Sequence, residues 1–167
     1  MTIIAANFEV RLSGGAGNAN PNASLGGAIS TTAYSSATDG LFDAVSAAEA
    51  SAGRVEFRCV YLRNGHASTQ MTTARIWIAS QPAHPGSTLE IGVGTSAVNG
   101  TEQTVANETT APTGVTFSAP STAATGLALG NIPAGQHRAI WYRRTIAAGS
   151  GNVAATTATP GLDCETT

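Results

Sequence analysis

Residues 54–63 read RVEFRCVYLR, and this stretch decides the fold class. Polar and apolar side chains alternate along it, which is the pattern of a β-strand because successive side chains point to opposite faces of a sheet. The dipeptide Asn64-Gly65 follows, and Asn-Gly is favoured in two-residue hairpin turns. The stretch therefore predicts a strand that leads into a hairpin turn. The alternation places Val55, Phe57, Cys59 and Tyr61 on the core face and Arg54, Glu56 and Arg58 on the other.

Shorter runs of the same kind recur along the chain, separated by Gly, Pro and Asn residues typical of turns. They cover residues 8–12, 74–79, 88–93, 101–106, 114–118, 126–130 and 137–146. This spacing of short strands favours one antiparallel sandwich over an α/β fold. The predicted core comprises Val55, Phe57, Cys59, Tyr61, Ile76, Ile78, Ile91, Phe117, Leu127, Leu129, Ile140 and Trp141.

One stretch, residues 41–52, is compatible with a helix of one or two turns. Ser46 and Glu49 have the spacing of a capping box, in which each side chain bonds the other residue's backbone N–H. Gly53 is expected to end the helix.

The composition narrows the classes of function. The 167 residues match one domain in size, and 11% of them are charged, against about a quarter in typical globular domains. All eight basic residues are Arg and the net charge is −2, so no electrostatic attraction to nucleic acid or to an anionic membrane is expected. No signal peptide is expected, because residues 1–12 have neither a basic start nor a long apolar run, and no apolar run in the sequence reaches the ~20 residues that a membrane span needs.

Two polar segments are predicted to contact neighbouring proteins. Residues 13–40 (SGGAGNANPNASLGGAISTTAYSSATDG) are expected to form an extended loop or arm, because a loop this long in a compact domain is generally functional or disordered. Residues 148–167 are expected to form a tail that docks on a neighbour. The interface candidates in the first segment are Asn18, Asn20, Pro21, Asn22, Leu25 and Ile29.

Three arginines in residues 137–146 complete the predicted interface. Arg138, Arg143 and Arg144 alternate with aromatic residues, an arrangement that could stack on nucleic-acid bases. In a strand, however, Arg138 and Arg144 point one way and Arg143 the other, so they form no single basic stripe. Ion pairs at a protein interface are the favoured interpretation.

No residue pattern in the sequence predicts catalysis, a metal site or a cofactor site. The three histidines occur outside HExxH and away from cysteine, and no serine lies in GxSxG. Asp39 and Asp43 match a calcium loop only weakly, because the further ligand positions are missing. Cys59 is expected to be a buried thiol and Cys164 lies in the tail segment; a disulfide between them is left open.

Four segments resemble small structural proteins of tailed-phage virions that have an immunoglobulin-like fold. They are FEVRLSGGAGNANPNASLGGAIS, SAAEASAGRVEFRCVYLRN, EIGVGTSAVNGTEQTVANETTAP and IPAGQHRAIWYRRTIAAG. Phe57, two residues before Cys59, also occupies the place of the corner Tyr in immunoglobulin-like domains, but lacks its hydroxyl. The resemblance implies one immunoglobulin-like sandwich over residues 1–167 and a non-enzymatic role in the phage particle.

Three functions follow from this reading. The first is a capsid decoration (cement) protein on the outer face of the phage head. It would be made in the host cytoplasm, would bind the major capsid protein, and would form a homo-oligomer, with a trimer favoured. The second is a tail or baseplate component. The third is a carbohydrate-binding module or small hydrolase, in which Trp77, Trp141, Tyr61 and Tyr142 would contact the sugar.

Overall fold

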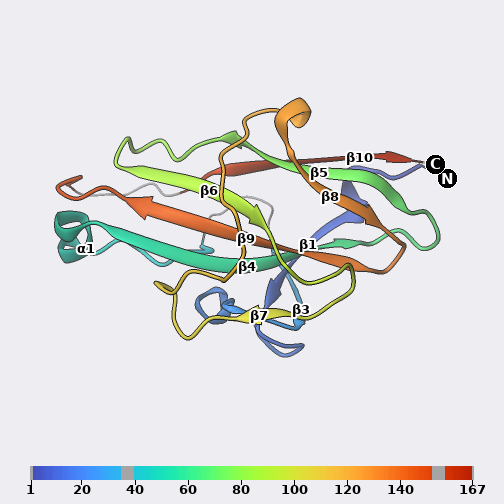
Figure 1. The fold of residues 1–167 in the computed structure, drawn as a ribbon, viewed down its shortest axis with the longest axis horizontal. Coiled ribbons are helices and arrows are strands. Elements are labelled where there is room, and N and C mark those ends of the chain that lie inside the picture. Colours follow the sequence, from blue (N-terminus) through green and yellow to red (C-terminus); the bar gives the residue numbers. More distant parts are fainter. Residues whose placement is uncertain (1, 35–39, 152–156, 167) are drawn as a thin grey trace.

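The computed structural model describes residues 2–34, 40–151 and 157–166, and its elements are mostly strands (Figure 1). All strand pairings are antiparallel and one short α-helix is present in the described residues, which confirms the predicted all-β sandwich. The strands are β1 (Phe8–Ser13), β2 (Gly26–Gly27), β3 (Ile29–Ala33), β4 (Arg54–Asn64), β5 (Met71–Ser80), β6 (Ser87–Val93), β7 (Glu102–Thr104), β8 (Leu127–Ile132), β9 (His137–Ile146) and β10 (Thr159–Thr166). The helix is α1 (Ala47–Ala52), and the 3-10 turns are η1 (Ala5–Asn7), η2 (Pro21–Ala23) and η3 (Ala123–Thr125).

Two sheets form the sandwich. The large sheet has the order β3-β1-β4-β9-β6 and the small sheet has the order β10-β5-β8. Apolar side chains of the two sheets meet in the main core, because each strand turns alternate residues toward its partner sheet. The large sheet contributes Val60, Leu62, Ile140 and Tyr142, and the small sheet contributes Ile76, Ile78, Leu129 and Ile132.

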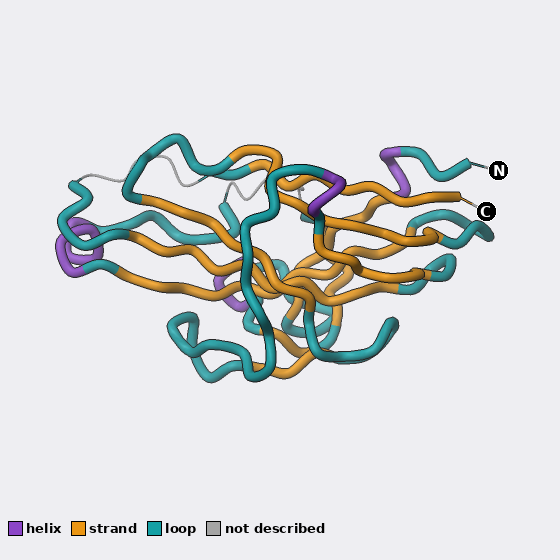
Figure 2. Tube along the Cα trace, turned by 45° about the horizontal axis from the view of Figure 1, so that its top comes forward, coloured by secondary structure: helices purple, strands orange, loops and turns teal. Residues whose placement is uncertain are grey.

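A third layer covers the other face of the large sheet. We call this layer the cap; it consists of residues 14–28 and 94–118, and it holds the two-stranded pair β2-β7. Figures 1 and 2 show it on the side of the large sheet away from β5, β8 and β10. Beneath it lies a second core, in which Phe57, Cys59, Tyr61 and Trp141 are buried. The central strands are therefore buried on both faces.

Backbone hydrogen bonds fasten the cap to β4 where β1 has ended. The N–H of Cys59 donates to the carbonyl of Ser24 (2.8 Å), and the N–H of Phe57 donates to the carbonyl of Glu108 (2.7 Å). The hydroxyl of Tyr61 joins β2 to β7, since it donates to the Gly27 carbonyl and accepts from the Glu102 N–H. The cap therefore completes the hydrogen bonding of a central strand.

The helix forms as the sequence predicts. Ser46 caps α1 by accepting from the N–H of Glu49, the Glu49 carboxylate accepts from the N–H of Ser46, and Gly53 ends the helix with φ +78°. Two backbone donors of the first turn are thus satisfied locally, so six residues suffice to form a helix here.

Burial corrects part of the predicted core. Val55 is 40% exposed, although its alternation partners Phe57, Cys59 and Tyr61 are buried. The cap covers this face of β4 from Phe57 onward and leaves Val55, near the start of the strand, exposed, which the alternation pattern does not reveal. Phe117 and Leu127 are half-buried. The other predicted core residues are buried as expected.

The described parts of both predicted contact segments pair with strands of their own domain, so the extended arm and the docking tail are wrong for them, whereas their contact with neighbouring proteins stays a prediction. Within residues 13–40, β3 pairs with β1 and β2 pairs with β7; positions 35–39 lie outside the described residues. Within residues 148–167, β10 pairs with β5 along its length, and positions 152–156 and 167 lie outside the described residues. These segments form strands although their residues are small and polar, because the backbone of each strand pairs with unpaired backbone groups of a neighbouring strand.

Two local predictions also fail. Asn64-Gly65 does not form a two-residue turn: β4 and β5 are joined by residues 65–70, and the Asn64 side chain donates to the Thr69 and Ile132 carbonyls. Residues 114–118 form a single bridge between Ser118 and Ile91 in place of a strand. This bridge, with the side-chain amide of Gln81 bonded to the backbone of Leu89, covers the edge of β6.

The two cysteines are separate. Cys59 lies in the core under the cap, Cys164 packs against the core between the sheets, and both are free thiols. Burial raises the pKa of the Cys59 thiol far above its usual range. No helix among the described residues is long and apolar enough to cross a membrane.

Candidate functional site

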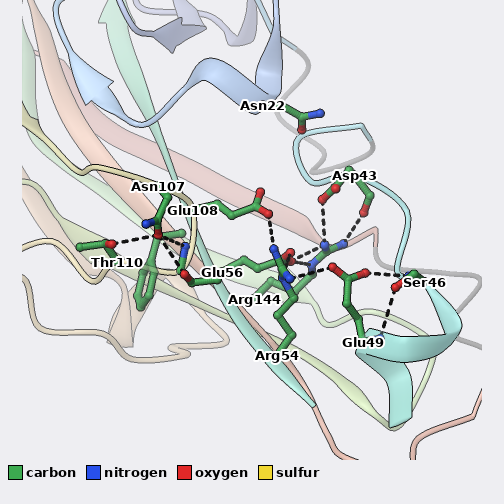
Figure 3. A network of polar contacts seen from close by, with 12 residues as sticks. Asn22, Asp43, Ser46, Glu49, Arg54, Glu56, Asn107, Glu108, Thr110 and Arg144 are labelled. Carbon is green, nitrogen blue, oxygen red and sulfur yellow. Dashed lines mark hydrogen bonds and ion pairs between the residues drawn. The ribbon is translucent and has the colours of Figure 1, made fainter. Parts of the chain in front are cut away.

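A cluster of arginines and carboxylates lies at the α1 end of the large sheet (Figure 3). At its centre, Arg144 of β9 stands opposite Glu56 of β4, and its Nε donates to Glu56 Oε2 at 2.6 Å. The side chains of both residues are 1% exposed. Arg144 also donates to the carbonyl of Asp43 at 2.8 Å, which ties the segment before α1 to the sheet.

Two further arginines extend the cluster along β4. Arg58 is fully buried and pairs with Glu108 of the cap at 2.5 Å. Arg54 pairs with Glu56 (2.7 Å), with Glu49 of α1 (2.9 Å) and with Glu108. The cluster therefore joins both central strands to α1, to the segment before it and to the cap.

Phe42 covers the cluster on the side of the main core. The guanidinium carbons of Arg144 and Arg58 lie 4.7 and 5.5 Å from the centroid of its ring. An aromatic face attracts a cation at such distances, and more strongly where water is excluded. Phe42 is 4% exposed, so it also shields the ion pairs from solvent.

The charges of the cluster stabilise one another. Burial by itself would raise the pKa of Glu108, but the neighbouring Arg58 and Arg54 hold that pKa below its usual value. Hydrogen bonds from the backbone and hydroxyl of Ser46 lower the pKa of Glu49. Burial would lower the pKa of Arg54, but its bond to Glu108 and the charges of Glu56 and Glu49 raise it.

Carboxylate oxygens of Asp43, Glu56 and Glu108 come within 4.8 Å of one another, which is close enough to share a metal ion. Each of these carboxylates, however, already pairs with one or more of the three arginines. A bound cation would have to displace guanidinium groups that are held in place by burial. The arrangement fits a structural clamp and does not fit a metal centre.

The structure separates the predicted interface residues into two groups. The six residues from the first segment lie on or next to the cap. Asn20 and Asn22 are exposed there, Asn18 and Pro21 are half-buried, and Leu25 and Ile29 are half-buried against the core under the cap.

The three arginines do not join this surface. Arg144 is buried in the cluster, and Arg143 pairs with Glu90 and lies 5.0 Å from the ring centroid of Phe117. Arg138 donates to the carbonyl of Ser96. Arg144 and Arg143 thus form ion pairs within the domain, whereas the predicted ion pairs lay at an interface with another protein.

The cap presents an uncharged outer surface. Residues 14–28 contain no charged side chain, and the two charged residues of 94–118 are withdrawn from it: Glu102 is 3% exposed and Glu108 is paired with Arg58 and Arg54. The exposed side chains here are small, and they include Ala16, Ala23, Ala28, Thr104, Ala106, Thr109, Thr110 and Thr116.

The histidines have structural partners. His66 is buried, and its Nδ1 accepts from the N–H groups of Ser68 and Thr69. His84 Nδ1 accepts from the N–H of Gly86. The His137 ring lies edge-on to Tyr61 at 4.9 Å, and its pKa is lowered by burial and by the charge of Arg63. In the part of the chain that is described, no bond joins a histidine to a serine hydroxyl or a cysteine thiol.

Of the four aromatic residues considered for sugar contact, three are buried in the cores. Trp141 and Tyr61 are 0% exposed and Tyr142 is 3% exposed, so none of them can meet a ligand. Trp77 is half-exposed on the small sheet.

Sequence reasoning missed the cluster. Arg54, Glu56 and Arg58 were assigned to one face of a strand, but nothing in the sequence pairs them with Arg144, Glu108 or Asp43, which lie up to about ninety residues away.

Comparison with known protein families, curated proteins and solved structures found no match to this chain.

Proposed function

We propose that the protein is a capsid decoration protein, which binds the outer face of a phage head through the uncharged surface of its cap. The resemblance of four sequence segments to tailed-phage virion proteins supplies the class of function. The observation that supports the cap as the binding surface is the absence of charge on its exposed residues.

An uncharged surface of small side chains suits a permanent contact with another protein. Charged residues are depleted in the centres of protein interfaces, because removing them from water is costly. Ala and Gly lose little or no side-chain entropy when they are buried, and they let the partner's backbone come close. Most of the positive charge is already paired within the domain, since six of the eight arginines form ion pairs among the described residues.

The anchoring of the cap supports a mechanical role. Its backbone is bonded to β4, and Arg58 and Arg54 hold Glu108 on the same strand. A surface that is ordered before binding loses little entropy when it docks. A force on the cap would therefore pass directly into the central sheet, which is what a protein that holds capsid subunits together requires.

Binding to shells tests the proposal. Recombinant protein is mixed with purified phage shells that lack it, and co-sedimentation is measured for the wild type and for a matched pair of variants. Ala28→Glu places a charge on the cap, and Ala128→Glu places the same charge on β8, on the opposite side of the molecule; both alanines are exposed. Loss of binding in Ala28→Glu alone is the expected result.

Two outcomes would contradict the proposal. If both variants bind shells as the wild type does, the cap is not the docking surface. If the protein is found by mass spectrometry in separated tails and not in heads, the tail or baseplate role replaces decoration. The same purified particles would give the copy number and test the expected homo-oligomer.

A further inference from the structure

The outer face of the small sheet lies on the side of the molecule away from the cap (Figure 1). Alternation turns Ala74, Ile76 and Ile78 of β5 into the core, so the residues between them point outward. The outward residues are exposed or half-buried: Thr73, Arg75, Trp77 and Ala79 on β5, Gly161, Asp163 and Glu165 on β10, and Ala128 and Gly130 on β8. Trp77 is the single large aromatic residue among them.

The indole of Trp77 lies flat over Gly161, its partner on β10. A Cβ atom added to Gly161 would stand 2.1 Å from Cε2, 2.4 Å from Cζ2 and 2.5 Å from Nε1 of the indole. These three distances describe a point above the face of the ring, because a point beside its edge would lie closer to Nε1 and Cζ2 than to Cε2. One face of the indole therefore covers the glycine, and the opposite face is turned away from the sheet.

Charged groups flank this aromatic face. Arg75 and Asp163 are Cα partners, two pairs along from Trp77 and Gly161 in the same strands and therefore on the same face. Both are exposed, and neither forms an ion pair within the described residues. With Glu165, Thr73, Cys164 and η3 they line a cavity of about 230 Å³ further along the same strands, and Trp77 itself does not line it. The face thus offers an aromatic plane, a guanidinium donor and carboxylate acceptors side by side.

We propose that this face binds a pyranose sugar of a surface glycan. The C–H groups on one face of the sugar ring would pack on the open face of Trp77, while its hydroxyls would donate to Asp163 and accept from Arg75. A flat, half-buried indole fits a sugar ring better than it fits a protein surface, because aromatic hot spots at protein interfaces fill pockets in the partner. The inference is independent of shell binding, since the cap lies on the opposite side.

Saturation-transfer NMR with cellohexaose, maltohexaose and chitohexaose as probes tests the proposal. We expect at least one probe to bind the wild type, and Trp77→Ala to weaken binding roughly tenfold, equivalent to about 1.4 kcal/mol. Trp77→Phe should retain part of the affinity. Arg75→Met and Asp163→Asn should also weaken binding, and since neither side chain is in the core, these variants report on the site even if Trp77→Ala unfolds.

Ala28→Glu is the matched control: it should keep sugar binding and lose shell binding, whereas Trp77→Ala should do the reverse. The proposal is overturned if none of the probes binds the wild type, or if Trp77→Ala and Asp163→Asn bind as tightly as the wild type. Loss of shell binding in Trp77→Ala would also overturn it and would identify the face as a protein interface.

Discussion

Glu56 and Arg144 stand opposite one another on the two central strands, and neither side chain is more than 1% exposed. Two opposite charges buried at such a position lie in a low-dielectric environment. Each stabilises the other there, because a buried charge without a partner is costly. Their pairing also orders Asp43 and Phe42, which pack on the arginine. The cluster is therefore expected to behave as a single unit that stabilises one end of the sandwich.

Removing one member of this pair should be costly. Glu56→Gln removes the buried partner of Arg144 and leaves it only the more exposed carboxylate of Asp43, 3.4 Å away, so we expect the free energy of unfolding in urea to fall by about 3 kcal/mol. Glu9→Gln is the control, because Glu9 pairs with Arg11 and Arg63 where all three side chains are partly exposed, and pairs open to solvent contribute about 0–1 kcal/mol. Equal losses in the two variants would contradict the role assigned to the buried pair.

Glu102 should make stability depend on pH. Burial would raise the pKa of its carboxyl, but hydrogen bonds from Ser96, Thr95 and Gln103 outweigh burial and lower the pKa to about 2. The folded pKa lies below the unfolded value of about 4.3, so this stabilisation is present above that pH and is lost as the pH falls toward 2.

The contribution is about 3 kcal/mol for a shift of this size. Urea unfolding of the wild type and of Glu102→Gln at pH 6 and pH 2.5 measures it as the difference between the two proteins. Glu102→Gln should be less stable at pH 6 and should lose less stability on acidification. A variant with the same pH dependence as the wild type would show that other carboxyls, such as Glu108, control the acid response.

Val55 and Phe57 lie on the same face of β4 but should respond differently to truncation. Phe57→Ala empties a site beneath the cap and is expected to cost about 3–5 kcal/mol, because the surrounding side chains cannot fill the cavity. Val55→Ala should cost less than about 1 kcal/mol, since Val55 is 40% exposed. Thermal and urea unfolding compare the two, and a small effect of Phe57→Ala would disprove the second core.

A side chain at Gly161 should displace the indole of Trp77. Gly161→Ala places a methyl group against the face of Trp77, which forces the indole away from β10. We expect a loss of about 1–3 kcal/mol and a change in tryptophan fluorescence. Gly17→Ala is the control, because an added Cβ there meets no atom within 4 Å. Unchanged fluorescence in Gly161→Ala would show that the ring does not lie on the glycine.

Deleting residues 13–32 should unfold the protein. The deletion removes β2, most of β3 and the Ser24 carbonyl that accepts from Cys59, and it uncovers the core around Trp141. Circular dichroism and solubility of the deletion variant would show the result. A stable, folded variant would instead mean that this segment is the detachable arm that its polar composition suggests.

The sequence by itself determined the elements that depend on neighbouring residues. The alternation in residues 54–63 and 137–146 predicted the two central strands, since a period of two requires no knowledge of the partner. The capping pair Ser46 and Glu49 predicted α1 and its end at Gly53 for the same reason. The low fraction of charged residues, together with the lack of sequence motifs for catalysis, metal binding or cofactor binding, indicated a structural role, which remains a proposal.

Only the tertiary structure decided which segments pair with one another and which surfaces stay exposed to solvent. Residues 26–33 and 159–166 are polar and carry no strand pattern, and they become strands because β1, β7 and β5 offer them unpaired backbone groups. Glu56 and Arg144 lie 88 residues apart in the chain, and their contact follows from the register between β4 and β9. Long-range register depends on the packing of whole sheets, so the charged cluster, the neutral cap and the flat indole of Trp77 could be recognised only in the folded chain.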